Sequence, residues 1–360
     1  MRRWAVLLLL LGSAWPAMAA KTLTIAQVEE LLAKLVGKAD GKVAGELDNA
    51  QLTERVSAAR LARWEAEFPG SRATRALMKL ADMSAFLDPP AADVIPDPPP
   101  DPDTQRHMLW MAEQYVGTTI SRLPDLSATR ETTHFEATSS ETGDSVGGGA
   151  KPLQWTNVCS RTITYRDGHE VLDEDAGKQE KEPALGLATH GEFGPILAQV
   201  LSDALESQVS FARWEQGASE PAAVFHYAVP EDASHFQVNI MIGGQAQTVH
   251  PAYHGEIEID PETGAILRLS EVAEMTAPQE AMRAAIEVEY APVAIGDRKT
   301  ICPVRGVAFS RIPVPVGNGN GEAQGRRPWP IQTHLNDVAF TRYHAFRSEA
   351  RIVDGSETSK

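Results

Sequence analysis

The sequence predicts an α+β protein: a short N-terminal helical module followed by a mostly antiparallel, curved β-sheet domain with one or two packed helices. Apolar residues recur every three or four positions up to residue 88, a proline-rich stretch follows at 89–102, and most later apolar residues alternate with polar ones. We therefore divide the chain at these changes of pattern. The expected parts are a signal peptide at 1–19, a helical module at 20–88, a linker at 89–102, a β-rich domain at 103–353 and a disordered tail at 354–360.

The first residues have the pattern of an export signal. Arg2 and Arg3 precede a short apolar run, and the small residues Ala17 and Ala19 suit signal peptidase, so we expect cleavage after Ala19. The apolar run is too short for a hydrocarbon core of about 30 Å, and no later run reaches about 18 apolar residues. We expect an exported protein, periplasmic or extracellular, that does not span a membrane.

Composition excludes some partners. The formal net charge is −16, which repels nucleic acid and anionic lipid headgroups, so we expect no nucleic-acid partner. The sequence contains no phosphate-binding loop, dinucleotide fingerprint, nucleophile elbow or spaced zinc ligands, and we expect no cofactor and no enzymatic activity.

The N-terminal helices carry start and stop signals. Thr24 and Gln27 form a capping-box pattern, and Gly37 is placed to end the helix that follows. Further helical patterns end at Pro69-Gly70 and at Pro89-Pro90. The linker at 89–102 contains seven prolines and should be a stiff, extended spacer. Another helix is expected at 104–123.

Alternation with a period of two predicts the strands. It is clearest at 224–229 and 236–242, and it recurs at 163–165 and 338–346. Turn residues at 166–169 and 260–264 lie between such patterns and indicate hairpins. One helix, beginning near Pro195, interrupts the strands. This is the pattern of antiparallel strands that bury one face.

The chain has two cysteines, Cys159 and Cys302, both in predicted strands. Because an exported protein meets an oxidising compartment, we expect a disulfide between them. The alternative is that both are buried thiols that pack as small apolar residues.

Histidines supply the weak candidates for a metal or hydrolytic site. His250, His254 and Glu256 would share one face of a strand and suit zinc, although Pro251 excludes a helix here, and rim histidines are the alternative. Three other histidines could join an acid and a serine in a hydrolytic site, but nothing in their spacing indicates one: His226, His235 and His344.

Aromatic residues in or beside the strands are the candidates for a ligand site. If the sheet curls around a helix, they would line an apolar cavity for an acyl chain or a peptide; the alternative is that they fill an ordinary core. These residues are Trp155, Trp214, Phe225, Tyr227, Phe236 and Tyr253.

The order of the elements resembles the half-barrel of periplasmic lipoprotein carriers and of a lipid-sensing regulator of envelope stress. The resemblance rests on the helix at 104–123, the strands at 127–136, 159–165 and 170–172, and the hairpin phrase at 254–268. It implies an antiparallel sheet that curls round helices to form an apolar cavity. The N-terminal helices and the linker are not part of that fold. The segments 53–55, 60–65, 128–135 and 191–197 resemble exported proteins of soil bacteria, a resemblance that brings no activity with it.

These observations predict a non-enzymatic envelope protein whose curved sheet binds a lipid or other apolar ligand, or a protein partner. The N-terminal helices would supply a second contact surface for an envelope partner. The alternatives are a purely structural interaction module with a filled core and an envelope hydrolase with a dispersed site.

Overall fold

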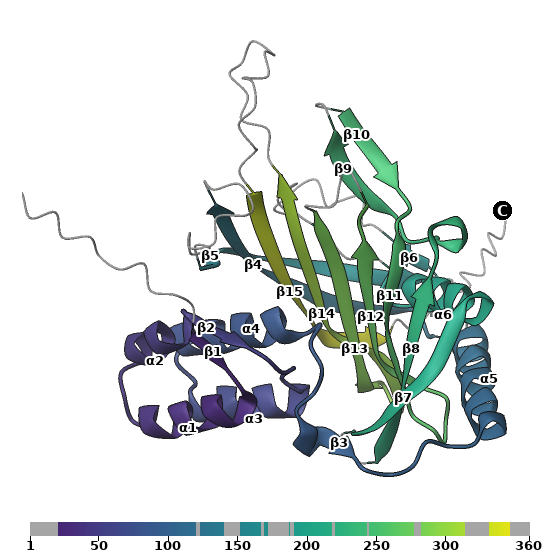
Figure 1. Ribbon diagram of the computed structural model, residues 1–360, viewed down its shortest axis with the longest axis horizontal. Helices are drawn as coiled ribbons and strands as arrows, with labels where there is room; N and C mark the ends of the chain where they lie inside the picture. Colours follow the sequence, from purple (N-terminus) through teal and green to yellow (C-terminus); the bar gives the residue numbers. More distant parts are fainter. Residues whose placement is uncertain are drawn as a thin grey trace, which may run out of the picture.

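The computed structural model describes residues 21–119, 123–139, 152–166, 169–171, 187, 191–217, 220–242, 245–276, 282–313 and 331–345. The expected signal peptide and C-terminal tail lie outside these residues. The fold is α+β, as predicted: a helical module lies beside a large, open, mostly antiparallel sheet, and two further helices lie on the opposite side (Figure 1).

The helical module has its own core. It contains β1 (Lys21–Leu23), α1 (Ile25–Leu35), α2 (Asp40–Leu47), β2 (Ala50–Leu52), α3 (Ala58–Glu67) and α4 (Ser71–Ser84), with β1 and β2 paired in parallel. The predicted capping box is present, since Gln27 N donates to Thr24 Oγ1 and Thr24 N donates to Gln27 Oε1. The helices bury their apolar stripes against one another, with Val28, Leu47, Trp64 and Leu77 at the centre.

The proline-rich segment is fastened to the sheet at one point. Within it, η1 (Ala91–Asp93) leads into β3 (Val94–Ile95), which pairs antiparallel with β7 (Gln208–Gln216). Trp214 Nε1 also donates to the carbonyl of Pro98 at 3.1 Å. Val94 and Ile95 are β-branched and favour a strand, so the segment forms a short edge strand where the sequence predicted only a spacer.

The large sheet has eleven strands in the order β3-β7-β8-β11-β12-β13-β14-β15-β4-β5-β6, and every adjacent pair is antiparallel. The strands not yet given are β4 (Leu126–Ser139), β5 (Gln154–Arg166), β6 (His169–Val171), β8 (Pro221–Val229), β11 (Ala252–Ile259), β12 (Ile266–Glu274), β13 (Arg283–Ile295), β14 (Arg298–Pro313) and β15 (Ile331–Ala345). A separate hairpin joins β9 (Val238–Ile242) to β10 (Gln245–Val249). The predicted hairpin turn at 260–264 is confirmed between β11 and β12.

We call the face of the sheet that packs on α5 (Pro102–Thr119) and α6 (Pro195–Glu206) the inner face. Both helices bury an apolar stripe against it. Ala112 of α5 and Val200 of α6 share one core with Ile257, Leu269 and Val288 of the sheet. The inner face is therefore filled by side chains along β8 and β11–β13.

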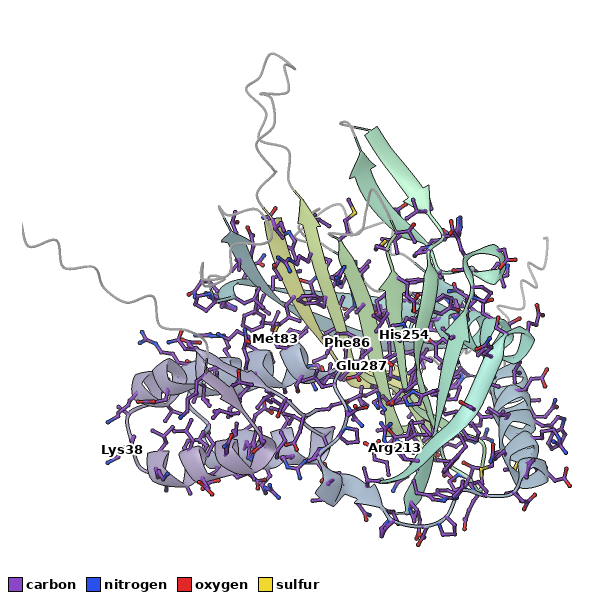
Figure 2. All side chains as sticks on the ribbon, in the orientation of Figure 1. Lys38, Met83, Phe86, Arg213, His254 and Glu287 are labelled. Atoms are coloured by element: carbon purple, nitrogen blue, oxygen red, sulfur yellow. The ribbon has the colours of Figure 1, made fainter. Side chains whose placement is uncertain are left out.

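The opposite face, here called the outer face, carries the helical module. Ala85 and Phe86, just after α4, pack with Phe135, Val307 and Leu335 of the sheet. In Figure 2 Phe86 lies where the module meets the sheet. The module therefore covers strands whose polar residues the sequence pattern alone would place in water.

The expected disulfide is not formed. Cys159 and Cys302 are both buried thiols. Cys159 lies on β5 and Cys302 on β14, and β15 and β4 lie between these strands. Three strand spacings amount to roughly 14 Å, about twice the Cα separation that a disulfide can bridge. The predicted disulfide was wrong because the sequence does not show that two strands separate β5 from β14.

Within the described residues, we find no helix with the length and apolar character needed to cross a membrane.

Candidate functional site

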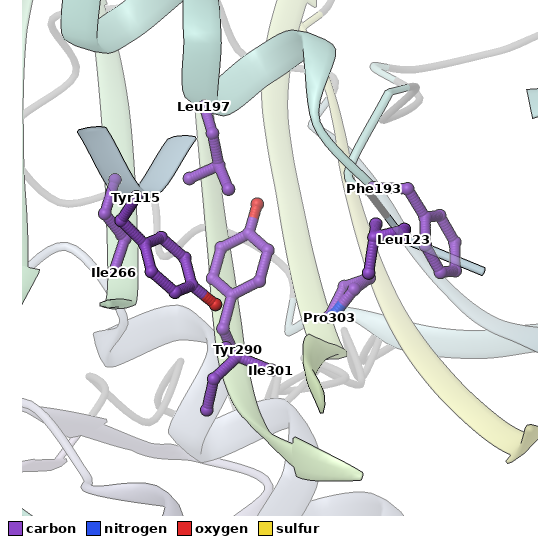
Figure 3. Close-up of a pocket in the computed structure, with 8 residues that line it drawn as sticks. All are labelled: Tyr115, Leu123, Phe193, Leu197, Ile266, Tyr290, Ile301 and Pro303. Carbon is purple, nitrogen blue, oxygen red and sulfur yellow. The ribbon is translucent and has the colours of Figure 1, made fainter. Parts of the chain in front are cut away.

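A small apolar pocket lies between the two helices and the inner face of the sheet (Figure 3). Its volume is about 10 Å³, room for roughly one water molecule. It is lined by Tyr115, Leu123, Phe193, Leu197, Ile266, Tyr290, Ile301 and Pro303. The interior beneath the helices is thus nearly filled and could not by itself enclose an acyl chain.

A much larger open groove adjoins this pocket and shares Tyr115 and Ile301 with it. Its volume is about 680 Å³, within the range typical of small-molecule sites. It lies between the C-terminal end of α5, the β11–β12 turn and the β13–β14 turn. The other lining residues are Thr118, Pro124, Asp260, Thr263, Ala265, Ile295, Gly296, Asp297, Arg298, Lys299, Thr300 and Ala345. We take this groove as the candidate site.

Two glycines shape its walls. Gly264 in the β11–β12 turn has φ +75°, and Gly296 in the β13–β14 turn has φ +61°, a region that other residues enter at a cost. A Cβ on Gly264 would lie only 2.5 Å from the backbone carbonyl carbon of Met111, whereas a Cβ on Gly296 would meet nothing within 4 Å. The β11–β12 turn can therefore approach α5 closely only because residue 264 is glycine.

The groove is apolar at its base and charged at its rim. Tyr115 and Ile301 form the base, while Arg298 and Lys299 lie side by side on the β13–β14 turn with Asp297 next to them. This polarity suits an amphipathic ligand whose apolar part enters towards Tyr115. Because both cations are exposed, they can meet a charged headgroup without a buried desolvation cost.

The polar groups near the base are held neutral or hydrogen-bonded. Burial raises the pKa of Tyr115 to about 12 and the pKa of the nearby Cys302 thiol to about 12. The hydroxyl of Tyr290 donates to the carbonyl of Glu192 at 3.0 Å. At neutral pH these groups are protonated and suit binding better than proton transfer or nucleophilic attack.

The six aromatic residues expected at a ligand site do not come together. Phe225, Tyr227, Phe236 and Tyr253 belong to the packed core of the inner face, and Trp214 packs against that core. Trp155 lies apart on β5, 46% exposed, with the Arg75 guanidinium 4.8 Å from its ring centroid. None of the six is among the residues that line the pocket or the groove.

Tyr253 belongs instead to a buried polar cluster beneath α6. Its hydroxyl donates to Asp203 Oδ2 at 2.7 Å, and the Nδ1 atom of His235 lies 2.7 Å from Asp203 Oδ1. Glu271 is close by and almost fully buried, with Gln199 Nε2 at 3.5 Å from its carboxylate. Burial, reinforced by the charge of Asp203, raises the pKa of Glu271 to about 8.

The structure assigns other contacts to the metal candidates. His254 and Glu256 lie on the same face of β11, as the sequence suggested, but His254 Nδ1 is 2.9 Å from Glu274, and Glu256 binds two arginines. His250 is exposed just before β11. Among the described residues no group of three metal-binding side chains is arranged to hold an ion.

The three histidines considered for a hydrolytic site are also dispersed. His226 on β8 is 3.5 Å from Glu256 on the outer face, and His235, whose side chain is exposed, contacts Asp203 of α6. His344 lies near the end of β15, paired in register with Ser127. These positions do not place the three imidazoles in one site.

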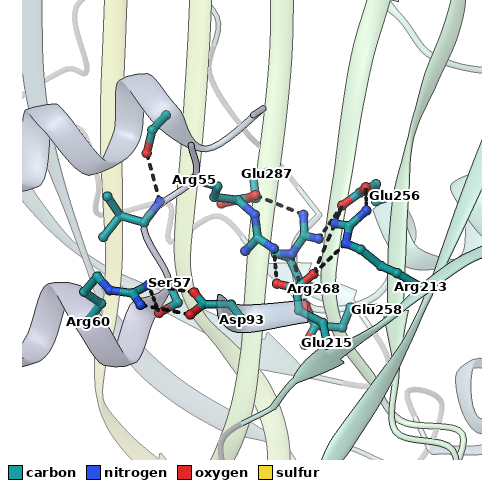
Figure 4. A network of polar contacts seen from close by, with 12 residues as sticks. Arg55, Ser57, Arg60, Asp93, Arg213, Glu215, Glu256, Glu258, Arg268 and Glu287 are labelled. Atoms are coloured by element: carbon teal, nitrogen blue, oxygen red, sulfur yellow. Dashed lines mark hydrogen bonds and ion pairs between the residues drawn. The ribbon is translucent and has the colours of Figure 1, made fainter. Parts of the chain in front are cut away.

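An ion network on the outer face was not predicted from the sequence. It crosses successive strands beneath the helical module and is drawn in Figure 4. Arg213 of β7 binds both carboxylate oxygens of Glu256, at 2.7 and 2.8 Å. Arg268 of β12 donates to Glu256, Glu258 and Glu287, at 2.6, 3.1 and 3.3 Å.

Two further contacts tie this network to the helical module. Arg55, which precedes α3, binds Glu215 of β7, and both side chains are 6% exposed. Asp82 of α4 binds Arg305 of β14, which also donates to Asp337 at 2.9 Å. One sequence signal could have revealed the network: arginine, aspartate and glutamate recur at the alternating polar positions of several strands.

The network shifts the acidity of its members in opposite directions. Burial alone would raise the pKa of Glu256, but the hydrogen bonds and charges of Arg213 and Arg268 outweigh it and lower that pKa to about 2. Among the described residues, Glu287 binds the guanidinium of Arg268 alone, and there burial dominates and raises the pKa of Glu287 to about 7. The surrounding burial also raises the pKa of Glu258.

No family model matches the chain, and no curated protein matches it.

Proposed function

We propose that the protein is an exported, non-enzymatic binding protein that takes an amphipathic ligand, with an acyl-chain-like apolar part, in the groove between α5 and the two β-hairpin turns. The observation that carries the proposal is a groove of about 680 Å³ that is apolar where it meets the interior and charged at its rim. The ligand's apolar part would contact Tyr115 and Ile301, and its headgroup would lie near Arg298 and Lys299. Because the pocket beneath the helices is nearly filled, we place the ligand in the groove at the two hairpin turns and not within the curve of the sheet.

The test uses cis-parinaric acid, a fluorescent fatty acid, as the probe. The substitution Thr118→Trp adds an indole on the exposed wall of the groove without disturbing a buried position. Glu113→Trp is the matched control, because Glu113 is exposed on the same helix but does not line the groove.

We expect saturable binding to the native protein and an affinity reduced about tenfold or more in Thr118→Trp, while Glu113→Trp binds as the native protein does. Absence of saturable binding to the native protein, or an equal loss in both variants, would reject the groove as the site.

A second candidate, an interaction module without a ligand, is favoured by the filled core and by one sheet edge. Within the described residues, β5 has β4 along one side but on the other only β6, which pairs with Thr164–Arg166. Trp155 and Val158 are exposed along that edge, which suits the addition of an extended strand. Sedimentation should then show self-association that Val158→Lys abolishes; a monomer at all concentrations contradicts this candidate.

A further inference from the structure

The contact between the helical module and the sheet is rich in buried charge. Arg55 and Asp82 of the module reach the sheet's Glu215 and Arg305, and Lys79 Nζ donates to the carbonyl of Leu153 at 3.3 Å. The apolar part of the contact is small and centres on Ala85 and Phe86. Attachment of the module therefore depends on how these charges are balanced.

Carboxyl groups outnumber guanidinium groups around Arg305. Asp82 is fully buried on α4, and Asp337 of β15 is 5% exposed; both bind the one guanidinium. Glu289 of β13 lies 3.8 Å from Arg305 on its other side. Two further charged groups act on this site from neighbouring elements, Glu65 of α3 and Glu287 of β13, and Glu287 in turn pairs with Arg268 of β12.

One cation cannot neutralise several buried carboxylates at once. Like charges held this close in a buried site favour retention of a proton on one of them. Burial first, and then the charge of Asp337, raise the pKa of Asp82 well above its usual range, against the opposing effect of Arg305. Among the described residues, Asp82 Oδ2 has no hydrogen-bond partner, so this oxygen is free to carry the proton.

We propose that the helical module is a pH-sensitive cover of the outer face, held closed while Asp82 carries a proton and Arg305 binds both Asp82 and Asp337, and released when Asp82 loses that proton. Loss of the proton leaves two buried carboxylates facing each other across the contact, and their repulsion separates α4 from β14 and β15. Release would uncover Phe135, Val307 and Leu335 on the outer face.

The experiment measures the distance between the module and the sheet in the full chain. Spin labels are attached at Lys38→Cys on the module and Glu262→Cys on the β11–β12 turn, both exposed, while the native cysteines are buried. Distance distributions are recorded by double electron–electron resonance from about pH 6 to about pH 10, with circular dichroism to confirm that the chain stays folded.

We expect one narrow distribution at the acidic end that broadens to longer distances as the pH rises. Asp82→Asn removes the titrating charge while keeping the side chain's shape, so this variant should stay narrow throughout. Asp232→Asn, an exposed control away from the contact, should broaden as the native protein does.

A native protein that stays narrow over the whole range overturns the proposal, and so does an Asp82→Asn variant that opens at the same pH. If Asp82→Asn does not fold, Asp337→Asn carries the same expectation, because it removes the other member of the pair.

Discussion

Arg268 is the residue on which most of the outer-face network converges. Its side chain is 4% exposed and donates to three glutamates that come from two strands, β11 and β13. Arginine suits this position because its planar guanidinium stays charged and presents donors in several directions. Breaking a buried pair costs more than forming it gains, because the partners left behind keep their charge.

Replacing Arg268 with alanine should therefore lower the free energy of unfolding by about 3–5 kcal/mol, measured by urea denaturation. Arg106→Ala is the control, since Arg106 also contacts a carboxylate but is 69% exposed, and its loss should cost less than about 0.5 kcal/mol. Equal losses of unfolding free energy in the two variants would contradict a stabilising role of the buried network.

Glu271 makes a second residue-scale prediction, about pH. Its folded-state pKa of about 8 lies above that of an unfolded glutamate, so the folded state holds its proton more tightly. Its contribution to stability is fully present below the unfolded pKa and is lost as the pH rises through about 8. Thermal unfolding from about pH 5 to about pH 9 should show a decline in stability that continues up to about pH 8 and then levels off, and Glu271→Gln should reduce this decline. An identical pH profile for the variant would show that Glu271 is not the buried acid described here.

At the scale of elements, the β11–β12 turn and α5 form one wall of the groove through Gly264. Alanine at Gly264 should cost about 1 kcal/mol for its positive φ and about 1–3 kcal/mol more for the overlap with Met111. Alanine at Gly296 should cost only the roughly 1 kcal/mol that comes from the positive φ, because no atom of the described residues lies near that position. Differential scanning calorimetry of the two variants isolates the contact with α5; equal losses would mean that the turn is free to move away from the helix.

Local patterns predicted many of these elements but not their arrangement. The capping box at Thr24, the helix from Pro195 and the hairpin at 260–264 were predicted correctly because each rests on signals from neighbouring residues. The order of strands depends on contacts between segments that are distant in the sequence. For this reason a disulfide was predicted that does not form, and the pairing of Val94 and Ile95 with β7 was not predicted.

The candidate site was harder to predict than the fold. The alternation that marks β8 correctly places Phe225 inwards, but aromatic content alone cannot tell a filled core from a cavity wall. The groove is formed by turns and a helix end whose residues, such as Thr118 and Lys299, carry no periodic signal. The polar residues of the alternating strands were likewise expected to face solvent, because no local signal shows that a residue such as Arg268 lies beneath the helical module.

At the scale of the whole molecule, both faces of the sheet are partly covered, the inner one along β8 and β11–β13 by α5 and α6 and the outer one by the helical module (Figure 1). Where these layers lie, the described part of the sheet is packed against helices, so we expect a ligand to bind where the covering layers end. The groove at the two hairpin turns is such a place, and it adjoins the small apolar pocket between the described helices and strands.

The most direct test of this account is a crystal structure of the protein grown with dodecanoic acid. We predict electron density for an acyl chain that runs from Arg298 and Lys299 towards Tyr115 and Ile301, with the tail displacing the solvent of the groove. A saturated crystal in which the groove is empty, or in which the chain lies on another surface, would contradict the proposed function.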